Sequence, residues 1–181
     1  MQLGDILTFD RGVMRKEVTK DITVSCPLIT IVYTGTIYEG KQDPTRLFAA
    51  LRELFDEGLG ESDIEVEFYG DEQAWLQEEI ERYELLNTVF QCGRVSRKAA
   101  LQIQREADIL LVLKWEDPQE NGVYTGKVFE YLGARRPILA TGGHDDVVTE
   151  LLLETGAGVC ASTVQEIKEA LVGFIRDCRN R

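Results

Sequence analysis

The chain has 181 residues, of which 44% are hydrophobic and 29% are charged, a composition typical of one globular domain. Its formal net charge of −12 argues against a nucleic-acid-binding protein, because such proteins need a cationic surface to neutralise phosphates. No apolar run approaches the roughly 18 residues that span a bilayer, no secretory signal is visible, and the four cysteines lie far apart. We therefore expect a cytoplasmic protein without nucleic-acid partners and with no evident membrane contact.

Short β-rich runs alternate with helical patterns from Pro27 onward. Residues 1–26 have mixed charge and no hydrophobic period, so we interpret them as a leader or linker ahead of a domain at 27–181. Continuous apolar runs predict six strands, at 28–35, 64–70, 88–93, 108–113, 137–140 and 156–161. Each predicted strand is followed by a helical pattern.

Capping residues indicate where these helices begin. Asp43 with Pro44 is typical of a helix start, and we expect Asp71 to open a second helix and Ser96 a third. The last helix starts with a capping box, Thr163 to Glu166. It then shows an apolar stripe at helical spacing, formed by Ile167, Ala170, Leu171, Phe174, Ile175 and Cys178.

The order of elements predicts the fold class. Strands without in/out alternation are typical of a parallel sheet that is covered on both faces. Six strand–helix repeats predict an α/β fold, a doubly wound and mostly parallel six-stranded Rossmann-like sheet with helices on both faces. In such sheets ligands bind beyond the carboxyl ends of the strands, so the loops after the strands are where site residues are expected.

The loop that ends at Lys127 is the most informative of these. Thr125, Gly126 and Lys127 stand at a predicted helix start, where unpaired backbone N–H groups and the helix dipole favour an anion. Lys127 opposes that dipole unless an anion lies between them, the alternative being a lysine that extends into solvent. Glu130 shares its helix face, either as an ion-pair partner of Lys127 or as an acceptor for a diol.

Several segments in a fixed order resemble a known enzyme family. The segments are VYTGT, EFYG, FQCGRVS, ADILLVL, GVYTGKVFEYLGARRPILATGG and LLLETGAGV, and they span roughly residues 28–178. Together they resemble the C-terminal, donor-binding half of retaining GT-B glycosyltransferases of the group 1 type, which include sucrose synthase-like and mannosyltransferase enzymes. The resemblance implies transfer of a sugar from a nucleoside-diphosphate donor, such as a UDP or GDP sugar, to a hydroxyl acceptor.

The resemblance also implies roles for the loop after the first strand. Gly35 and Lys41 match a family loop that faces the donor pyrophosphate, whereas Thr36 stands where the family has arginine. Lys127 would replace the missing arginine charge. Gly70 follows the second strand, where turn chemistry is an equally good explanation for a glycine.

A second family motif pairs two glutamates with seven residues between them. Glu130 matches the second glutamate, which implies contact with the ribose hydroxyls of the donor. The first glutamate falls on Gly122, and whether Glu116 or Glu120 replaces that carboxylate is left open.

The remaining matches concern the base and the sugar. Arg94 and Val95 match the turn that contacts the base, and Gly142 and Gly143 match a flexible loop near the sugar. His144 follows them, and an exposed loop histidine is favoured over a catalytic base.

We therefore predict catalytic roles for Lys41, Lys127 and Glu130, and donor binding by the group Gly35, Thr36, Gly70, Arg94, Val95, Thr125, Gly126, Gly142 and Gly143. No metal or further cofactor is expected, because lysines and a helix start neutralise the departing diphosphate. The acceptor-binding domain is expected to be missing or supplied by a longer chain, which leaves the isolated domain inactive. The alternative is a catalytically degenerate Rossmann-like module that acts in regulation or scaffolding. A response-regulator receiver is disfavoured, since the loops TGTIYEGK and CGRVSRK lack its acidic residues.

Overall fold

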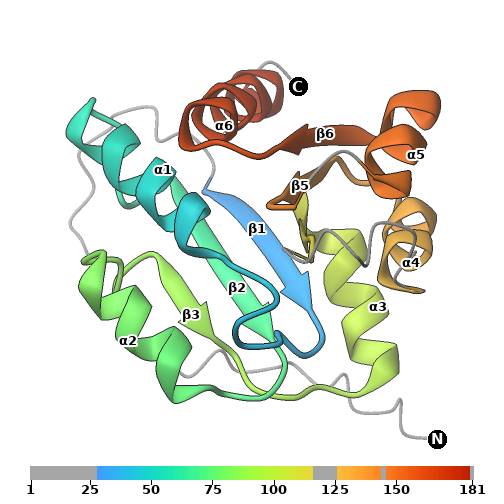
Figure 1. Cartoon of the computed structure of the whole chain (residues 1–181), viewed down its shortest axis with the longest axis horizontal. Helices are drawn as coiled ribbons and strands as arrows, with labels where there is room; N and C mark the ends of the chain where they lie inside the picture. The colour runs from blue at the N-terminus through green and yellow to red at the C-terminus, as the bar shows by residue number, and fades with distance from the viewer. Residues whose placement is uncertain (1–27, 116–125, 144–145, 180–181) are drawn as a thin grey trace, which may run out of the picture.

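A computed structural model of the chain describes residues 28–115, 126–143 and 146–179 (Figure 1). The predicted leader at 1–26 lies outside the described residues. Six strands form one sheet in the order β3-β2-β1-β4-β5-β6, and every neighbouring pair is parallel. The predicted α/β Rossmann-like fold is confirmed. The strands are β1 Ile29–Thr34, β2 Ile64–Tyr69, β3 Val89–Gln91, β4 Ile109–Leu113, β5 Ile138–Thr141 and β6 Gly158–Ala161. The helices are α1 Thr45–Asp56, α2 Ala74–Arg82, α3 Arg97–Glu106, α4 Gly126–Ala134, α5 Val147–Thr155 and α6 Val164–Arg179.

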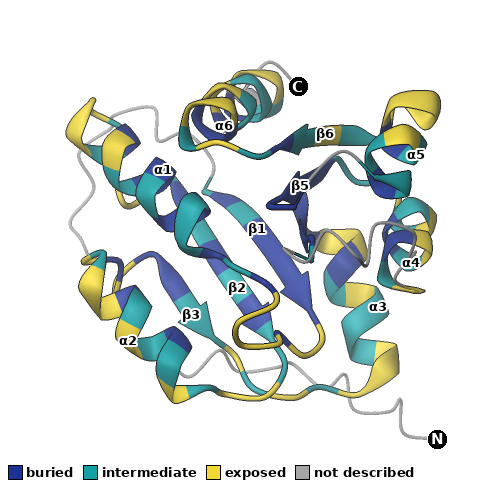
Figure 2. Cartoon of the chain, viewed as in Figure 1, coloured by how far each residue is buried: buried dark blue, intermediate teal, exposed yellow. Residues whose placement is uncertain are grey.

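Each face of the sheet carries its own hydrophobic core. Figure 2 shows the strands β1 and β5 between them mostly in the dark blue of buried residues. Successive residues of a strand point to opposite faces, so β1 sends Ile31 and Tyr33 to one core and Val32 to the other. Helices α1, α2 and α6 cover the first face, and α3, α4 and α5 cover the second. This double cover explains why β4 and β5 are buried along their whole length.

Strand β2 departs from the predicted continuous burial. Its residues alternate between buried and half-buried, with Glu65 and Glu67 on the side of Val32. The core on that face takes residues from β1, β4 and β5, but from β2 only the partly buried Tyr69. The two carboxylates therefore lie at the margin of the second face, where water still reaches them.

Two of the four helix starts predicted from capping residues are confirmed. Ser96 accepts a hydrogen bond from the Ala99 backbone N–H at 3.2 Å. In the capping box before α6, Thr163 Oγ1 accepts from the Glu166 backbone N–H at 3.2 Å, and a Glu166 carboxylate oxygen accepts from the Thr163 backbone N–H at 3.0 Å. The apolar stripe that follows packs against the first core, as predicted.

Two helix starts differ from prediction. Asp43 accepts a hydrogen bond from the Thr45 backbone N–H at 2.8 Å, but Pro44 occupies the cap position, so α1 begins one residue later than expected. The expectation that Asp71 opens a helix is wrong, because α2 begins only at Ala74. The Asp71 carboxylate instead binds the guanidinium of Arg94.

Candidate functional site

A pocket of about 260 Å³ opens at the carboxyl edge of the sheet, where β1, β2 and the loop after β3 meet α3 and α4. We call it the edge pocket. It brings together six predicted site residues that come from four separate segments of the chain: Gly35, Thr36, Gly70, Arg94, Val95 and Glu130. Thr34, Tyr69, Asp71, Ala100 and Gln104 complete its lining.

Two glycines let the ends of β1 and β2 approach each other closely. The Gly35 backbone N–H donates to the Tyr69 carbonyl at 2.7 Å, and a Cβ at Gly70 would lie only 3.0 Å from the Gly35 carbonyl carbon. Gly35 also has a φ of +116°, a region that side chains disfavour. Turn chemistry alone does not explain Gly70, because any side chain there would collide with the Gly35 backbone.

The Lys127 side chain is half-buried, and its ammonium packs against the Tyr33 ring beside this corner. Its Nζ lies 3.4 Å from the centroid of the Tyr33 ring, and a Cβ at Gly35 would lie 3.3 Å from the same nitrogen. Burial lowers the pKa of Lys127 to about 7, and the negative charge of Glu130 offsets only part of that effect. The alternative that this lysine extends into solvent is therefore wrong. An anion bound against Gly35 would favour its charged form.

Glu130 lies one turn further along α4 and pairs with a residue that the sequence did not indicate. Its carboxylate binds the Arg97 guanidinium at 3.0 Å, so the suggested Lys127–Glu130 ion pair is not formed. Arg97 is the first residue of α3, where a cation opposes the helix dipole just as Lys127 does in α4. A cation in the first turn of a helix, as at Lys127, is the one signal in the sequence that could have identified Arg97 as a site residue.

Arg94 and Asp71 form a second ion pair on the rim of the edge pocket. Both nitrogens of the guanidinium fork bind the Asp71 carboxylate, and this pairing holds the pKa of that carboxyl below its usual range. The predicted role of Arg94 rested on its backbone turn. The structure adds that its side chain closes the outer wall.

Two lining residues of the edge pocket, Thr34 and Gln104, belong to a hydrogen-bonded group that sequence reasoning missed. Gln104 Nε2 donates to Thr34 Oγ1 at 2.9 Å, and the Thr34 backbone N–H donates to the Tyr131 hydroxyl at 2.9 Å. Burial raises the pKa of Tyr131 to about 12, so the phenol stays protonated and neutral at physiological pH. These residues lie inside a strand and two helices, where polar side chains carry no loop signal.

Lys41 lies at the same edge of the sheet but does not line the edge pocket. Its Nζ is 4.4 Å from the centroid of the Trp115 ring, and that ring also packs against Tyr38. An isolated antiparallel bridge between Gln42 and Trp115 ties the loop after β1 to the end of β4. The structure therefore places Lys41 over the end of β4, and Lys127 beside β1.

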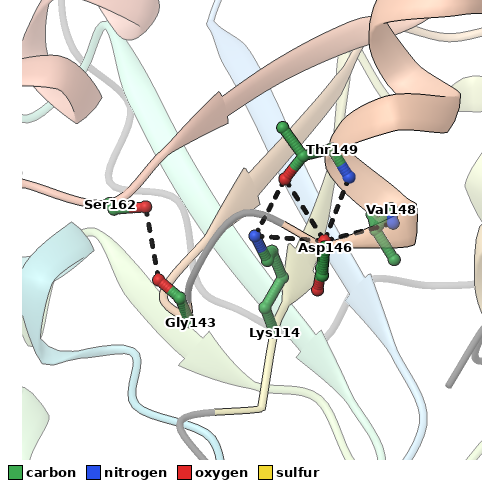
Figure 3. Close-up of polar contacts among 6 residues, drawn as sticks. All are labelled: Lys114, Gly143, Asp146, Val148, Thr149 and Ser162. Atoms are coloured by element: carbon green, nitrogen blue, oxygen red, sulfur yellow. Dashed lines mark hydrogen bonds and ion pairs between the residues drawn. The ribbon is translucent and has the colours of Figure 1, made fainter. Parts of the chain in front are cut away.

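Gly142 and Gly143 directly follow β5, and Gly143 lies beside Lys114 at the end of β4 (Figure 3). Both are buried rather than exposed in a mobile turn, and Ser162 Oγ donates to the Gly143 carbonyl at 3.4 Å. Beside them Lys114, whose side chain is 2% exposed, lies 3.2 Å from Asp146 Oδ1 and donates to Thr149 Oγ1 at 3.0 Å. Asp146 also accepts from two backbone N–H groups of α5, so this ion pair fixes the start of the helix.

Some predicted residues lie outside the described part of the chain. These are Thr125, His144, Gly122, Glu116 and Glu120. Gly126 is described and is the first residue of α4, as predicted for the anion-binding turn. Within the described ranges, no three histidine, cysteine or acidic side chains lie close enough to hold a metal ion.

No protein-family model and no curated protein sequence matches this chain. Solved structures do match its fold. WaaG, a glycosyltransferase involved in lipopolysaccharide biosynthesis, superposes with a TM-score of 0.62 at 14% identity, over 83% of this chain and 40% of its own. A UDP-N-acetylglucosamine 2-epimerase gives a TM-score of 0.58 at 14% identity, over 82% of this chain and 35% of its own. The pneumococcal O-GlcNAc transferase GtfA, in complex with UDP and GlcNAc, gives 0.55 at 17% identity, over 83% and 28%.

These matches concern the fold. The described chain shares the fold of one part of GT-B glycosyltransferases and UDP-GlcNAc 2-epimerases, and it spans two fifths or less of the length of these proteins. No helix in the described ranges combines the length and the apolar character that crossing a bilayer requires.

Proposed function

We propose that this chain is the donor-binding domain of a retaining GT-B glycosyltransferase, and that the edge pocket holds the nucleoside diphosphate of a nucleotide sugar. The observation that carries the proposal is the convergence of six residues from four segments on one pocket, with the Lys127 ammonium packed against its Gly35 wall. The start of α4 adds backbone N–H groups that have no partner within the helix, beside that cation.

The position of each group suggests how the donor lies. The diphosphate lies against Gly35, Thr36 and Lys127, because there the backbone can approach closely and a cation is at hand. The ribose lies beside the carboxylate of Glu130, and the base beside the turn at Arg94 and Val95. Lys41 and the Gly142–Gly143 corner remain predictions for the sugar side of the site.

The chemistry in this proposal is electrostatic. As the bond from the sugar to the diphosphate breaks, negative charge grows on the leaving phosphate, and preorganised donors at Gly126 and Lys127 stabilise it. The Lys127 ammonium already packs against the Tyr33 ring, so less water has to be displaced when the anion arrives. The proposal includes no metal ion, and a chelator should leave nucleotide binding unchanged.

A donor-binding domain alone does not complete such an enzyme. Because the chain spans two fifths or less of the matched structures, we propose that the acceptor-binding domain comes from a longer chain or a partner. The isolated chain should then bind nucleotides without measurable transfer. Transferase turnover by this chain alone, with a nucleotide sugar and a hydroxyl acceptor, would contradict that part of the proposal.

The test is calorimetric titration of the chain with UDP, GDP and ADP, and of the Lys127→Ala and Glu130→Ala variants. Each variant removes one charged contact, so we expect affinity for the preferred nucleotide to fall by about tenfold to a hundredfold. The matched controls are Lys168→Ala and Glu53→Ala, because this ion pair lies away from the pocket and gives the same changes in net charge.

The outcomes separate the proposed function from the scaffold alternative. Binding that both site variants weaken and both controls leave unchanged supports the donor site. Failure of all three nucleotides to bind at millimolar concentration would reject it in favour of a regulatory or scaffolding module. Equal losses in site variants and controls would show that net charge alone governs binding.

A further inference from the structure

One residue that lines the edge pocket carries a buried polar atom without a hydrogen-bond partner. Gln104, on α3, lines the pocket and is 1% exposed. Its Nε2 is used, since it donates to Thr34 Oγ1 at 2.9 Å, but its Oε1 has no hydrogen-bond partner. A buried carboxamide oxygen without a partner loses its hydration and gains nothing in return.

Such atoms are uncommon in folded proteins, and each asks for an explanation. Within the described ranges, three buried side-chain oxygens lack a partner, on Thr88, Gln104 and Thr141. Of these three residues, only Gln104 lines the edge pocket. The unpaired oxygen therefore belongs to a residue that lines the proposed donor site.

The surroundings of Gln104 hold it in place. Thr34 ends β1, and its backbone N–H donates to the hydroxyl of the fully buried Tyr131. The Thr34 hydroxyl also lies 3.4 Å from the same phenol oxygen. Because Thr34 is fixed from two sides, its bond to Gln104 fixes the carboxamide as well. The unpaired oxygen is therefore held as an acceptor on a residue that lines the pocket.

The position along β1 indicates which part of a nucleotide reaches this acceptor. Thr34 directly precedes Gly35, where the proposed function places the diphosphate. In a nucleotide the group next to the diphosphate is the ribose, whose hydroxyls are hydrogen-bond donors. Glu130 lines the same pocket and offers a second acceptor. Two acceptors in one pocket match the two hydroxyls of a ribose.

We propose that Gln104 is a specificity-determining residue of the edge pocket, whose carboxamide oxygen accepts a hydrogen bond from a ribose hydroxyl of the bound nucleoside diphosphate. This inference rests on the proposed function. It adds a second acceptor to Glu130, and it means that the site distinguishes ribonucleotides from deoxyribonucleotides.

The test uses whichever of UDP, GDP and ADP binds the chain tightest, together with its 2′-deoxy and 3′-deoxy analogues. Each ligand is titrated calorimetrically into the wild type, Gln104→Met and Thr88→Val. Methionine keeps the length of glutamine but removes both polar ends. Thr88→Val is the matched control, because it also removes a buried oxygen without a partner, at a residue that does not line the pocket.

We expect Gln104→Met to weaken binding of the ribonucleotide by about tenfold, the size of one lost hydrogen bond. One of the two deoxy analogues should bind the wild type about tenfold more weakly, and Gln104→Met should not weaken that analogue further. Thr88→Val should bind all three ligands as the wild type does.

Three results would overturn the inference. If Gln104→Met loses the same factor with all three ligands, the residue acts on the fold of the pocket and not on a hydroxyl. If Gln104→Met fails to fold, the wild-type titrations still decide, because equal affinity for the ribonucleotide and both analogues contradicts the inference. If the wild type binds no nucleotide, the proposed function fails as well.

Discussion

The buried ammonium of Lys127 predicts that nucleotide affinity depends on pH. In the free protein its pKa is lowered from the ordinary value of 10.5 to about 7, because burial disfavours the charged form. If the diphosphate binds only the charged form, apparent affinity falls with the fraction of protein that carries the proton. With a pKa of 7, that fraction drops about 50-fold between pH 7 and pH 9, equivalent to roughly 2 kcal/mol of binding free energy. Nucleoside diphosphates add little to this change, since their last phosphate pKa is about 6.

Proton uptake gives a direct assay of the same effect. At pH 8 about nine tenths of the free protein has neutral Lys127, so each bound nucleotide should take up about 0.9 proton. Calorimetry in two buffers of different ionisation enthalpy measures this number. Lys127→Met should bind more weakly, take up no proton, and show a flat affinity from pH 7 to pH 9. Wild-type binding that is equally flat, without proton uptake, would refute the reasoning.

Further predictions concern stability and the shape of the pocket, with unfolding free energies measured by urea denaturation. Between pH 7 and 10.5 the unfolded chain holds more protons on Lys127 than the folded chain does. The unfolding free energy of the wild type should therefore rise with pH relative to that of Lys127→Met, by up to about 5 kcal/mol. If there is no such relative rise, the lysine is solvated. Lys114→Met leaves Asp146, which is 16% exposed, without its cation, so it should lower the unfolding free energy by about 3 to 5 kcal/mol. Lys168→Met should lower it by only about 1 kcal/mol, because both partners of Lys168 are exposed. Equal losses in these two variants would contradict the view that Lys114 fixes α5. Gly70→Ala should lower stability by about 1 to 3 kcal/mol and weaken nucleotide binding, because its Cβ would collide with the Gly35 backbone. Gly133 lies on α4 with open space around it, so Gly133→Ala should instead raise the unfolding free energy by up to about 1 kcal/mol. If Gly70→Ala also raised it, the ends of β1 and β2 would not be in close contact.

The sequence was sufficient for the architecture because short-range patterns decide it. The apolar runs of β4 and β5 predict a doubly covered sheet, and Ser96 and the Thr163–Glu166 box predict helix starts that the structure confirms. The expectation that site residues lie in the loops after the strands also succeeded, because in a parallel sheet all of these loops lie at one edge. The edge pocket gathers six of those candidates.

What the sequence could not supply are contacts between side chains from distant elements. Arg97 and Glu130 are 33 residues apart, and Gln104 and Thr34 are 70 apart, so their pairing depends on how α3 packs on β1 and α4. Asp71 shows the same limit, because a nearby guanidinium outcompetes the backbone of a helix start for its carboxylate. Local propensity is a weak guide wherever a charged partner arrives from another element.

The two ion pairs on the rim of the edge pocket have a consequence for ligand choice. Arg94 lines the pocket, and Arg97 pairs with Glu130, which also lines it. Asp71 and Glu130 therefore already neutralise both guanidinium groups. A cell holds abundant small anions, such as inorganic phosphate and free polyphosphates, that are drawn to any unshielded cationic surface. The neutralised rim attracts these small anions only weakly. A ligand of the proposed donor site therefore has to fit the pocket in shape as well as in charge.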